Sequence, residues 1–148
     1  MNVYYNPLDT KCKSIIGGIK QNEKLVIRIF SEVYCTCLFV LQKDGGMAEY
    51  KEMQRTAQGW EIALCLSDIG LYFYSFEIDG KRAGCGQFHE LSFSEMFRPF
   101  QLLVADAAFD TPAWFKGGIM YQIFPDRFFS CGNVTLEEGK WQHKSWNE

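Results

Sequence analysis

The sequence has little of what marks nucleic-acid-binding or membrane-spanning proteins. Lys and Arg together number 15 against 18 Asp and Glu, which gives the 148-residue chain a formal net charge of -3. No basic cluster occurs, so the sequence predicts no nucleic-acid partner. The longest apolar run, within CTCLFVLQ at 35–42, is far shorter than the about 20 residues that a membrane-spanning helix needs. We therefore expect no membrane association either.

The six cysteines also lack the paired CxxC spacing of many structural zinc sites. Cys35 and Cys37 form a lone C-x-C, and with His89 and His143 they leave zinc binding as one interpretation. The irregular spacing favours the other interpretation, in which reduced thiols are mostly buried in a cytoplasmic protein. The opening MNVYYNPLDTKCKSIIGG has no apolar run of signal-peptide length, which agrees with a cytoplasmic location. The sequence thus predicts neither a metal nor a cofactor.

What the sequence does contain is enough apolar side chain for a substantial core. Hydrophobic residues make up 47% of the chain and aromatic residues 16%. This composition argues against disorder, and the length suits one compact domain with an appendage.

Alternating apolar residues predict a series of short strands in the N-terminal part of the chain. Along 71–78, for example, Tyr72, Tyr74, Phe76 and Ile78 fall on one face. The predicted strands are 24–30, 35–43, 48–55, 59–66, 71–78, 82–88 and 100–106. DGK at 79–81 predicts a hairpin turn, and 93–97 predicts a single helical turn capped by Ser92.

Strands at this even spacing, with no helix-length periodicity between them, predict an all-β fold of two packed antiparallel sheets. The fold that we expect is an immunoglobulin-like antiparallel β-sandwich at 1–108. A linker at 109–118 follows, in which Pro112 biases the preceding residue away from helix and two glycines loosen the backbone. Residues 119–148 form a separate C-terminal segment.

The segment GGIMYQIFPDRFF at 117–129 has the pattern of an apolar strand with Pro-Asp-Arg at its exit. Within TPAWFKGGIMYQIFPDRF at 111–128 the chain resembles the α-amylase superfamily of glycoside hydrolases, in particular the neopullulanase and cyclomaltodextrinase enzymes. In that subgroup an N-terminal β-sandwich, often classed as a starch-binding module, precedes a (β/α)8 barrel. The first barrel strand typically reads Tyr-Gln-Ile-Phe-Pro-Asp-Arg-Phe, and the same octet stands here at 121–128.

The resemblance implies that 119–148 is the truncated start of the catalytic barrel. IMYQIF is almost continuously apolar, as a barrel strand covered on both faces should be. A complete barrel needs about 250 residues, far more than the sequence has beyond residue 118. We therefore expect an accessory domain, a linker and one orphan strand.

The resemblance also implies a retaining mechanism in the parent enzyme, which needs two carboxylates about 5–5.5 Å apart. In this superfamily the nucleophilic Asp follows a Gly-x-Arg-x-Asp pattern on a later strand, and that pattern does not occur in the sequence. We therefore expect no catalytic residue here and no activity from this chain alone. Asp126 and Arg127 are interpreted as an ion pair at the strand exit. Asn133 lies where some relatives bind calcium, but its SCGN context has few carboxylates, so no metal is predicted.

Sugar binding by the sandwich would need exposed aromatic rings, because the CH face of a pyranose stacks on Trp or Tyr. Trp60, Tyr50, Tyr72 and Tyr74 are the candidates in the sandwich, and Tyr121 is the candidate in the barrel strand. A core position is the competing interpretation in each case. For Tyr72 and Tyr74 the face that they share with Phe76 favours the core.

Two functions from different classes remain open at this point. The first is an accessory N-terminal module of an α-glucan-hydrolysing enzyme, whose parent chain cleaves α-1,4 glucosidic bonds in starch-derived oligosaccharides. The second is a dimerisation or interaction domain that shapes its partner's active site and binds little sugar itself. Leu71 and Phe73 lie on the strand face opposite Tyr72, which favours a contact beyond the sandwich with the catalytic barrel or a homodimer partner. An extracellular immunoglobulin-like adhesion domain is a third alternative, and it would require disulfides.

Overall fold

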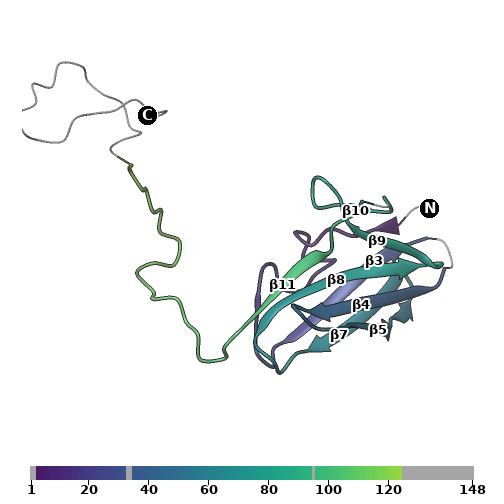
Figure 1. Ribbon diagram of the computed structural model, residues 1–148, viewed down its shortest axis with the longest axis horizontal. Helices are drawn as coiled ribbons and strands as arrows, with labels where there is room; N and C mark the ends of the chain where they lie inside the picture. Colours follow the sequence, from purple (N-terminus) through teal and green to yellow (C-terminus); the bar gives the residue numbers. More distant parts are fainter. Residues whose placement is uncertain (1–2, 33–34, 95, 125–148) are drawn as a thin grey trace, which may run out of the picture. The chain divides into compact units, whose positions relative to one another are not determined.

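Strands and turns, without a helix among the residues that the structure describes, make up the fold (Figure 1). The structure is a computed structural model that describes residues 3–32, 35–94 and 96–124. It divides the chain into two compact units, Met1–Asp110 and Thr111–Glu148. The described residues include no helix that could cross a membrane. A cytoplasmic location stays a prediction.

The named strands all belong to the first unit. They are β1 Val3–Tyr4, β2 Ile19–Lys20, β3 Lys24–Ser31, β4 Cys37–Lys43, β5 Ala48–Glu52, β6 Gln54–Thr56, β7 Gly59–Cys65, β8 Gly70–Ile78, β9 Lys81–Cys85, β10 Leu91–Ser92 and β11 Phe100–Ala105. They form two sheets with a shared apolar core. The prediction of an all-β sandwich is confirmed, whereas the immunoglobulin-like arrangement stays a prediction.

Four strands form the smaller sheet, in the order β1-β3-β7-β6, and every neighbouring pair is antiparallel. Along β3 the residues alternate between buried and partly exposed, so that Leu25, Ile27 and Ile29 reach the core. Because successive strand residues point to opposite faces, Arg28 and Phe30 lie on the outer face of this sheet.

β8 is the centre of the larger sheet. One edge of β8 pairs with β4, and β4 pairs with β5 on its other side. The other edge of β8 pairs with β11 along its first half and with β9 near its end. β10 extends β9, and β2 extends β11. The β2–β11 pair is parallel, unlike the antiparallel pairing predicted throughout. These two strands come from opposite ends of the sandwich sequence, so no hairpin forces them to run in opposite directions.

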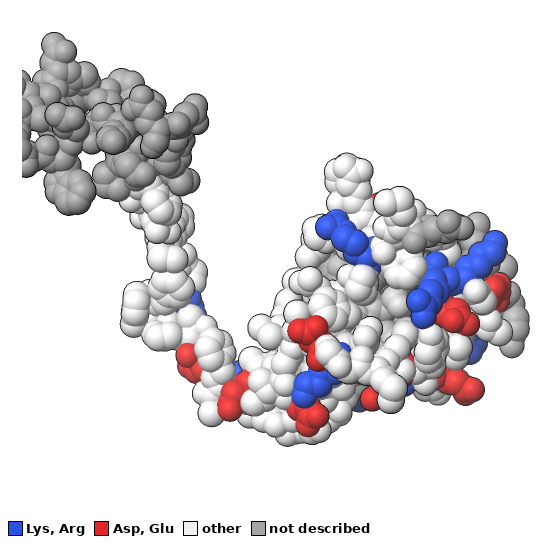
Figure 2. All heavy atoms as spheres, viewed as in Figure 1, with Lys and Arg blue, Asp and Glu red and all other residues white. Residues whose placement is uncertain are grey.

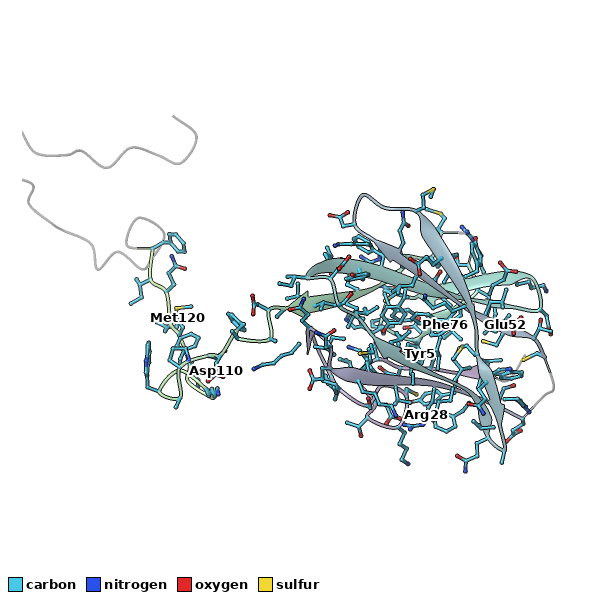
Figure 3. All side chains as sticks on the ribbon, turned by 90° about the horizontal axis from the view of Figure 1, so that it is seen from below. Tyr5, Arg28, Glu52, Phe76, Asp110 and Met120 are labelled. Atoms are coloured by element: carbon cyan, nitrogen blue, oxygen red, sulfur yellow. The ribbon has the colours of Figure 1, made fainter. Side chains whose placement is uncertain are left out.

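Aromatic side chains fill the space between the two sheets. The rings of Tyr5, Phe39, Tyr74, Phe76 and Phe100 contact one another at centroid distances of 4.9–6.4 Å. Figure 3 labels Tyr5 and Phe76 in this interior, where both rings are almost fully buried. Burial of each such ring contributes roughly 1.5–3 kcal/mol relative to an exposed side chain, so this cluster dominates the core.

The hairpin between β8 and β9 has the turn that DGK predicts. Ile78 pairs with Lys81, and the two residues between them, Asp79 and Gly80, have φ angles of 48° and 71°. Positive φ at both central residues matches the twist of the flanking strands, and Asp-Gly is a favoured sequence for it. The Asp79 carboxylate also accepts a hydrogen bond of 2.7 Å from the backbone N–H of Thr36, which ties the turn to the start of β4.

The single strand predicted at 48–55 is wrong, because the chain changes sheets at Met53. β5 pairs with β4 in the larger sheet, while β6 pairs with β7 in the smaller one. Met53 is buried at this crossing, and its backbone N–H bonds to the carbonyl of Cys37. A flexible apolar side chain therefore fills the edge of the sandwich where the two sheets are connected.

The predicted helical turn at 93–97 includes residue 95, which lies outside the described residues, so it stays a prediction. The segment before it pairs with β9 as β10, and the Ser92 hydroxyl accepts a hydrogen bond from the backbone N–H of Ser94. Ser92 thus holds the backbone of the segment that follows β10. Phe97 closes a turn by bonding to the Ser94 carbonyl.

The described part of the second unit, residues 111–124, contains turns and no strand. The backbone N–H groups of Phe115 and Lys116 both bond to the carbonyl of Pro112. The apolar side chains of 119–124 are exposed. Residues 125–128 of the predicted barrel strand lie outside the described residues. The boundaries at 1–108, 109–118 and 119–148 therefore stay predictions, as does the barrel assignment.

Candidate functional site

Tyr72 and Tyr74, two of the predicted sugar-binding residues, lie in the core. Tyr74 is 1% exposed, and its hydroxyl lies 2.7 Å from that of Tyr5. Its ring also stacks with the ring of Phe100. Tyr72 is 7% exposed and donates a hydrogen bond of 3.0 Å to the Asp68 carbonyl. Neither tyrosine presents an open ring face in this structure, as the competing core interpretation expected.

Trp60 lies where β7 meets β6 at the edge of the sandwich. It pairs with Ile29 and Arg55 on the neighbouring strands and is 5% exposed. The Arg55 guanidinium lies over the indole, 4.0 Å from the ring centre, which is a cation–π contact. A hollow of about 240 Å³ beside the ring also contacts Cys35 and Cys37. A sugar that stacked on this indole face would have to displace Arg55.

Tyr121 belongs to the second unit and is 74% exposed. Within the sandwich, Trp60 lies on the smaller sheet and the two tyrosines of β8 lie on the larger one. Sugar binding by Trp60, Tyr72, Tyr74 and Tyr121 stays a prediction.

A groove that sequence reasoning did not identify lies on the outer face of the smaller sheet. It has a volume of about 880 Å³ and is lined by Tyr4, Asp9, Lys11, Arg28, Phe30 and Gln58, among other residues. We call it the β1–β3 groove. A smaller hollow of about 270 Å³ shares Arg28, Phe30 and Gln58 with it and extends it toward β6. One signal was available in the sequence: in KLVIRIF, Phe30 falls out of phase with the three inward residues and so places a ring on the outer face.

Two aromatic rings lie side by side in the β1–β3 groove. Tyr4 and Phe30 are partners in the β1–β3 ladder, so both side chains leave the same face of the sheet. Their ring centroids are 6.4 Å apart and the ring planes are tilted by 38°. Tyr4 is 49% exposed, whereas Phe30 is partly buried. The Tyr4 hydroxyl donates a hydrogen bond of 3.1 Å to Asp9 Oδ2, which orients the ring, and this bond raises the pKa of Tyr4.

Gly59 leaves the other side of Phe30 open. It is the partner of Phe30 on β7, and its φ is 153°. A Cβ at this position would come within 1.9 Å of the Ile29 carbonyl oxygen. The close approach of β3 therefore requires glycine here, and as a result no side chain from β7 covers the Phe30 ring at this position of the ladder.

Charges of both signs line the β1–β3 groove. Asp9 and Glu32 are acidic, and Lys11 and Arg28 are basic, so the formal charges cancel. Nε of Arg28 bonds to Oε2 of Glu61 on β7 at 2.5 Å, and both side chains are partly exposed. Figure 3 labels Arg28. Acidic and basic side chains are also intermixed on the outer face of the larger sheet, which Figure 2 displays. The groove thus offers hydrogen-bonding groups without a net field that would select a charged ligand.

The five described cysteines are free thiols: Cys12, Cys35, Cys37, Cys65 and Cys85. The first three are buried, whereas Cys65 is exposed. Burial raises the pKa of the Cys37 thiol to about 12, so that it remains protonated near neutral pH. Within the described ranges no three His, Cys, Asp or Glu side chains come together as metal ligands.

The chain is similar to amylopullulanases. It is 42% identical to the amylopullulanase of Thermoanaerobacterium thermosulfurigenes over 186 aligned residues, which include 99% of this chain. It is 40% identical to the Thermoanaerobacterium saccharolyticum amylopullulanase over 186 aligned residues, which again include 99% of this chain. It is 61% identical to the Thermoanaerobacter thermohydrosulfuricus amylopullulanase over 87% of the chain.

The relatives are much longer than this sequence. The chain spans 10%, 14% and 10% of the three amylopullulanases, respectively. No family model matches the chain, and no solved structure matches it either. The amylopullulanases are therefore homologues of the chain over most of its own length, and the chain corresponds to a small part of each.

Proposed function

We propose that this chain is the accessory, non-catalytic N-terminal module of an α-glucan-hydrolysing enzyme of the α-amylase family. The observation that carries the proposal is the 42% identity to an amylopullulanase over 99% of the chain. The octet YQIFPDRF at 121–128, which resembles the first strand of an α-amylase barrel, supports the same family. The parent enzyme would hydrolyse α-1,4 glucosidic bonds in starch-derived oligosaccharides.

The sequence pattern supports a non-catalytic role for the module. The Gly-x-Arg-x-Asp pattern that carries the superfamily nucleophile does not occur in these 148 residues. Retaining hydrolysis requires both a nucleophilic carboxylate and an acid/base carboxylate. We therefore assign the chemistry to the barrel and a supporting role to the sandwich.

The second unit supports the proposed junction with a barrel. Ile119 is 96% exposed, Met120 is 76% exposed and Tyr121 is 74% exposed, although the segment is apolar. Consecutive exposed apolar residues are unfavourable in water unless another element covers them. A barrel strand with its neighbouring strands and helices in place would be covered on both faces.

The proposal is tested by measuring the release of reducing sugar from soluble starch. The isolated 148-residue chain is compared with a chimera in which it replaces the matching segment of the T. thermosulfurigenes amylopullulanase. We expect no release by the chain and starch hydrolysis by the chimera. Hydrolysis by the isolated chain would contradict the accessory role. A chimera that folds, as judged by circular dichroism, but does not hydrolyse starch would contradict the assignment to this family.

A dimerisation or interaction role is the second candidate, and one surface favours it. Leu103 on β11 pairs with Leu71 on β8, and Leu103 is 54% exposed on the outer face of the larger sheet. Phe73 continues this apolar surface along β8, where it pairs with Gln101. Sedimentation velocity of the chain and of Leu103→Lys tests this role. A dimer that the substitution abolishes would support it, and a monomer at every concentration would exclude self-association.

A further inference from the structure

The β1–β3 groove combines features that suit a sugar chain rather than a charged or purely apolar ligand. Tyr4 and Phe30 provide two neighbouring rings, and CH groups of a pyranose stack on such rings. Asp9, Arg28 and Gln58 provide acceptors and donors for hydroxyl groups around the rings. The groove volume of about 880 Å³ lies within the range of ligand-binding clefts.

We propose that the β1–β3 groove is a binding site for a neutral α-linked glucan, with Tyr4 and Phe30 as the stacking platform. This inference rests on the proposed function, because that function gives the chain a reason to meet glucans. Glucose units carry no charge, and the four charged groups that line the groove cancel formally. A phosphate or a polycation would gain no net attraction from such a lining.

The tilt between the rings favours an α-linked chain over a β-linked one. The planes of Tyr4 and Phe30 differ by 38°, so the platform is bent rather than flat. Successive units of an α-1,4-linked glucan turn relative to one another and the chain curves. A β-1,4-linked chain is an extended ribbon whose successive rings would need a flat platform. Two tilted rings can therefore each stack on one unit of a curved chain.

The local structure holds this platform in place before any sugar binds. The β1–β3 ladder fixes the spacing of the two rings, and the bond from Tyr4 to Asp9 orients the more exposed one. Asp9 is itself held in a turn, since its carbonyl accepts the backbone N–H of Cys12 and its Oδ1 accepts that of Lys11. Gly59 keeps the far side of Phe30 open. Such preorganisation reduces the entropy lost on binding.

The test is isothermal titration calorimetry of the 148-residue chain with maltoheptaose, and with cellohexaose as the β-linked comparison. Tyr4→Ala and Phe30→Ala each remove one ring, and each should weaken maltoheptaose binding about tenfold. Tyr4→Phe keeps the ring but removes the bond to Asp9, so it should weaken binding less than Tyr4→Ala does, which separates stacking from orientation of the ring. Tyr50→Ala is the comparison variant, because Tyr50 is a predicted sugar-binding residue that is 51% exposed on β5 of the other sheet, so weaker binding by this variant would place the sugar there and not in the groove. Thermal melts of every variant confirm that it is folded.

The outcomes separate this inference from the proposed function. Selective binding of maltoheptaose that both ring deletions weaken, with Tyr50→Ala unchanged, would support the groove. Binding that survives both deletions would overturn it and place the sugar elsewhere on an accessory module. No binding at millimolar sugar would also overturn it, while the chimera assay would still decide the enzyme assignment. Equal affinity for cellohexaose would overturn the α-selectivity inferred from the ring tilt.

Discussion

The buried hydroxyl pair of Tyr5 and Tyr74 allows a quantitative test of how the core is organised. Both side chains are 1% exposed and their hydroxyl oxygens are 2.7 Å apart. One hydroxyl must donate to the other, and both lie among apolar rings. Tyr5→Phe removes one hydroxyl and leaves the Tyr74 hydroxyl buried without that partner. An unpaired buried polar group costs about 1–3 kcal/mol of stability.

The magnitude of the effect distinguishes a coupled pair from two independent groups. Tyr5→Phe and Tyr74→Phe should each lower the free energy of unfolding by about 1–3 kcal/mol. The double variant leaves no unpaired hydroxyl, so its cost should fall short of the sum by about 0.5–3 kcal/mol. In a domain of this size each kcal/mol corresponds to about 4–8 °C in the melting temperature. The phenyl rings remain, so the ring contacts with Phe76 and Phe100 are kept.

Urea denaturation followed by far-UV circular dichroism at neutral pH measures the free energy of unfolding of the wild type, the two single variants and the double variant. Tyr50→Phe is the control, since Tyr50 is 51% exposed and accepts a hydrogen bond of 2.8 Å from Arg82 at the surface. Its cost should stay within about 0.5 kcal/mol. If the double variant loses as much stability as the two single variants together, the reasoning is refuted, because the two hydroxyls are then not coupled. The same Tyr74→Phe protein should bind maltoheptaose as the wild type does if Tyr74 is a core residue.

Two further predictions concern the backbone and the pH dependence of stability. Gly59→Ala should cost at least about 2 kcal/mol, because its Cβ would meet the Ile29 carbonyl oxygen. Gly45 also has a positive φ, 73°, but open space around it, so Gly45→Ala should lower the free energy of unfolding by only about 1 kcal/mol in the same urea assay. An equal loss of stability in the two variants would contradict the clash with the Ile29 carbonyl. Burial raises the pKa of Cys37 to about 12, and burial also raises the pKa of Tyr5. The unfolded chain therefore releases these protons first, near pH 9 and pH 10, while the folded protein keeps them. The contribution of these two groups to stability should be constant below about pH 9 and then fall by up to about 1.4 kcal/mol per pH unit for each group. Urea midpoints that do not change between pH 8 and pH 10.5 would contradict this.

Local sequence signals predicted the strands of this fold well where one face is buried. In β8 the alternation of Tyr72, Tyr74, Phe76 and Ile78 matches the buried face, and Asp-Gly forms the turn that follows. These features depend on neighbours in sequence, namely side-chain period and turn chemistry. They required no knowledge of which strand lies beside which.

Features that depend on distant neighbours could not be predicted in the same way. An alternating pattern does not say which sheet a strand joins, so the change of sheet at Met53 was missed. The parallel β2–β11 pair joins residues that are far apart in sequence, and β2 has only two residues. The groove was missed for the same reason, because Tyr4 and Phe30 become neighbours only through the pairing of β1 with β3.

Trp60, a predicted sugar-binding residue, and Phe30, which lines the β1–β3 groove, belong to adjacent pairs of the ladder between β3 and β7. On the inner face Ile29 pairs with Trp60, and on the outer face the next pair is Phe30 with Gly59. A one-residue slip of β3 would move Phe30 into the core, and a one-residue slip of β7 would move Trp60 to the solvent face, because strand faces alternate with a period of two. The clash that a side chain at position 59 would make with β3 therefore protects the register as well as the open ring of Phe30. Any loss of the groove through Gly59→Ala should thus be accompanied by a loss of stability, whereas Tyr4→Ala on the exposed edge should change the groove with little effect on the fold.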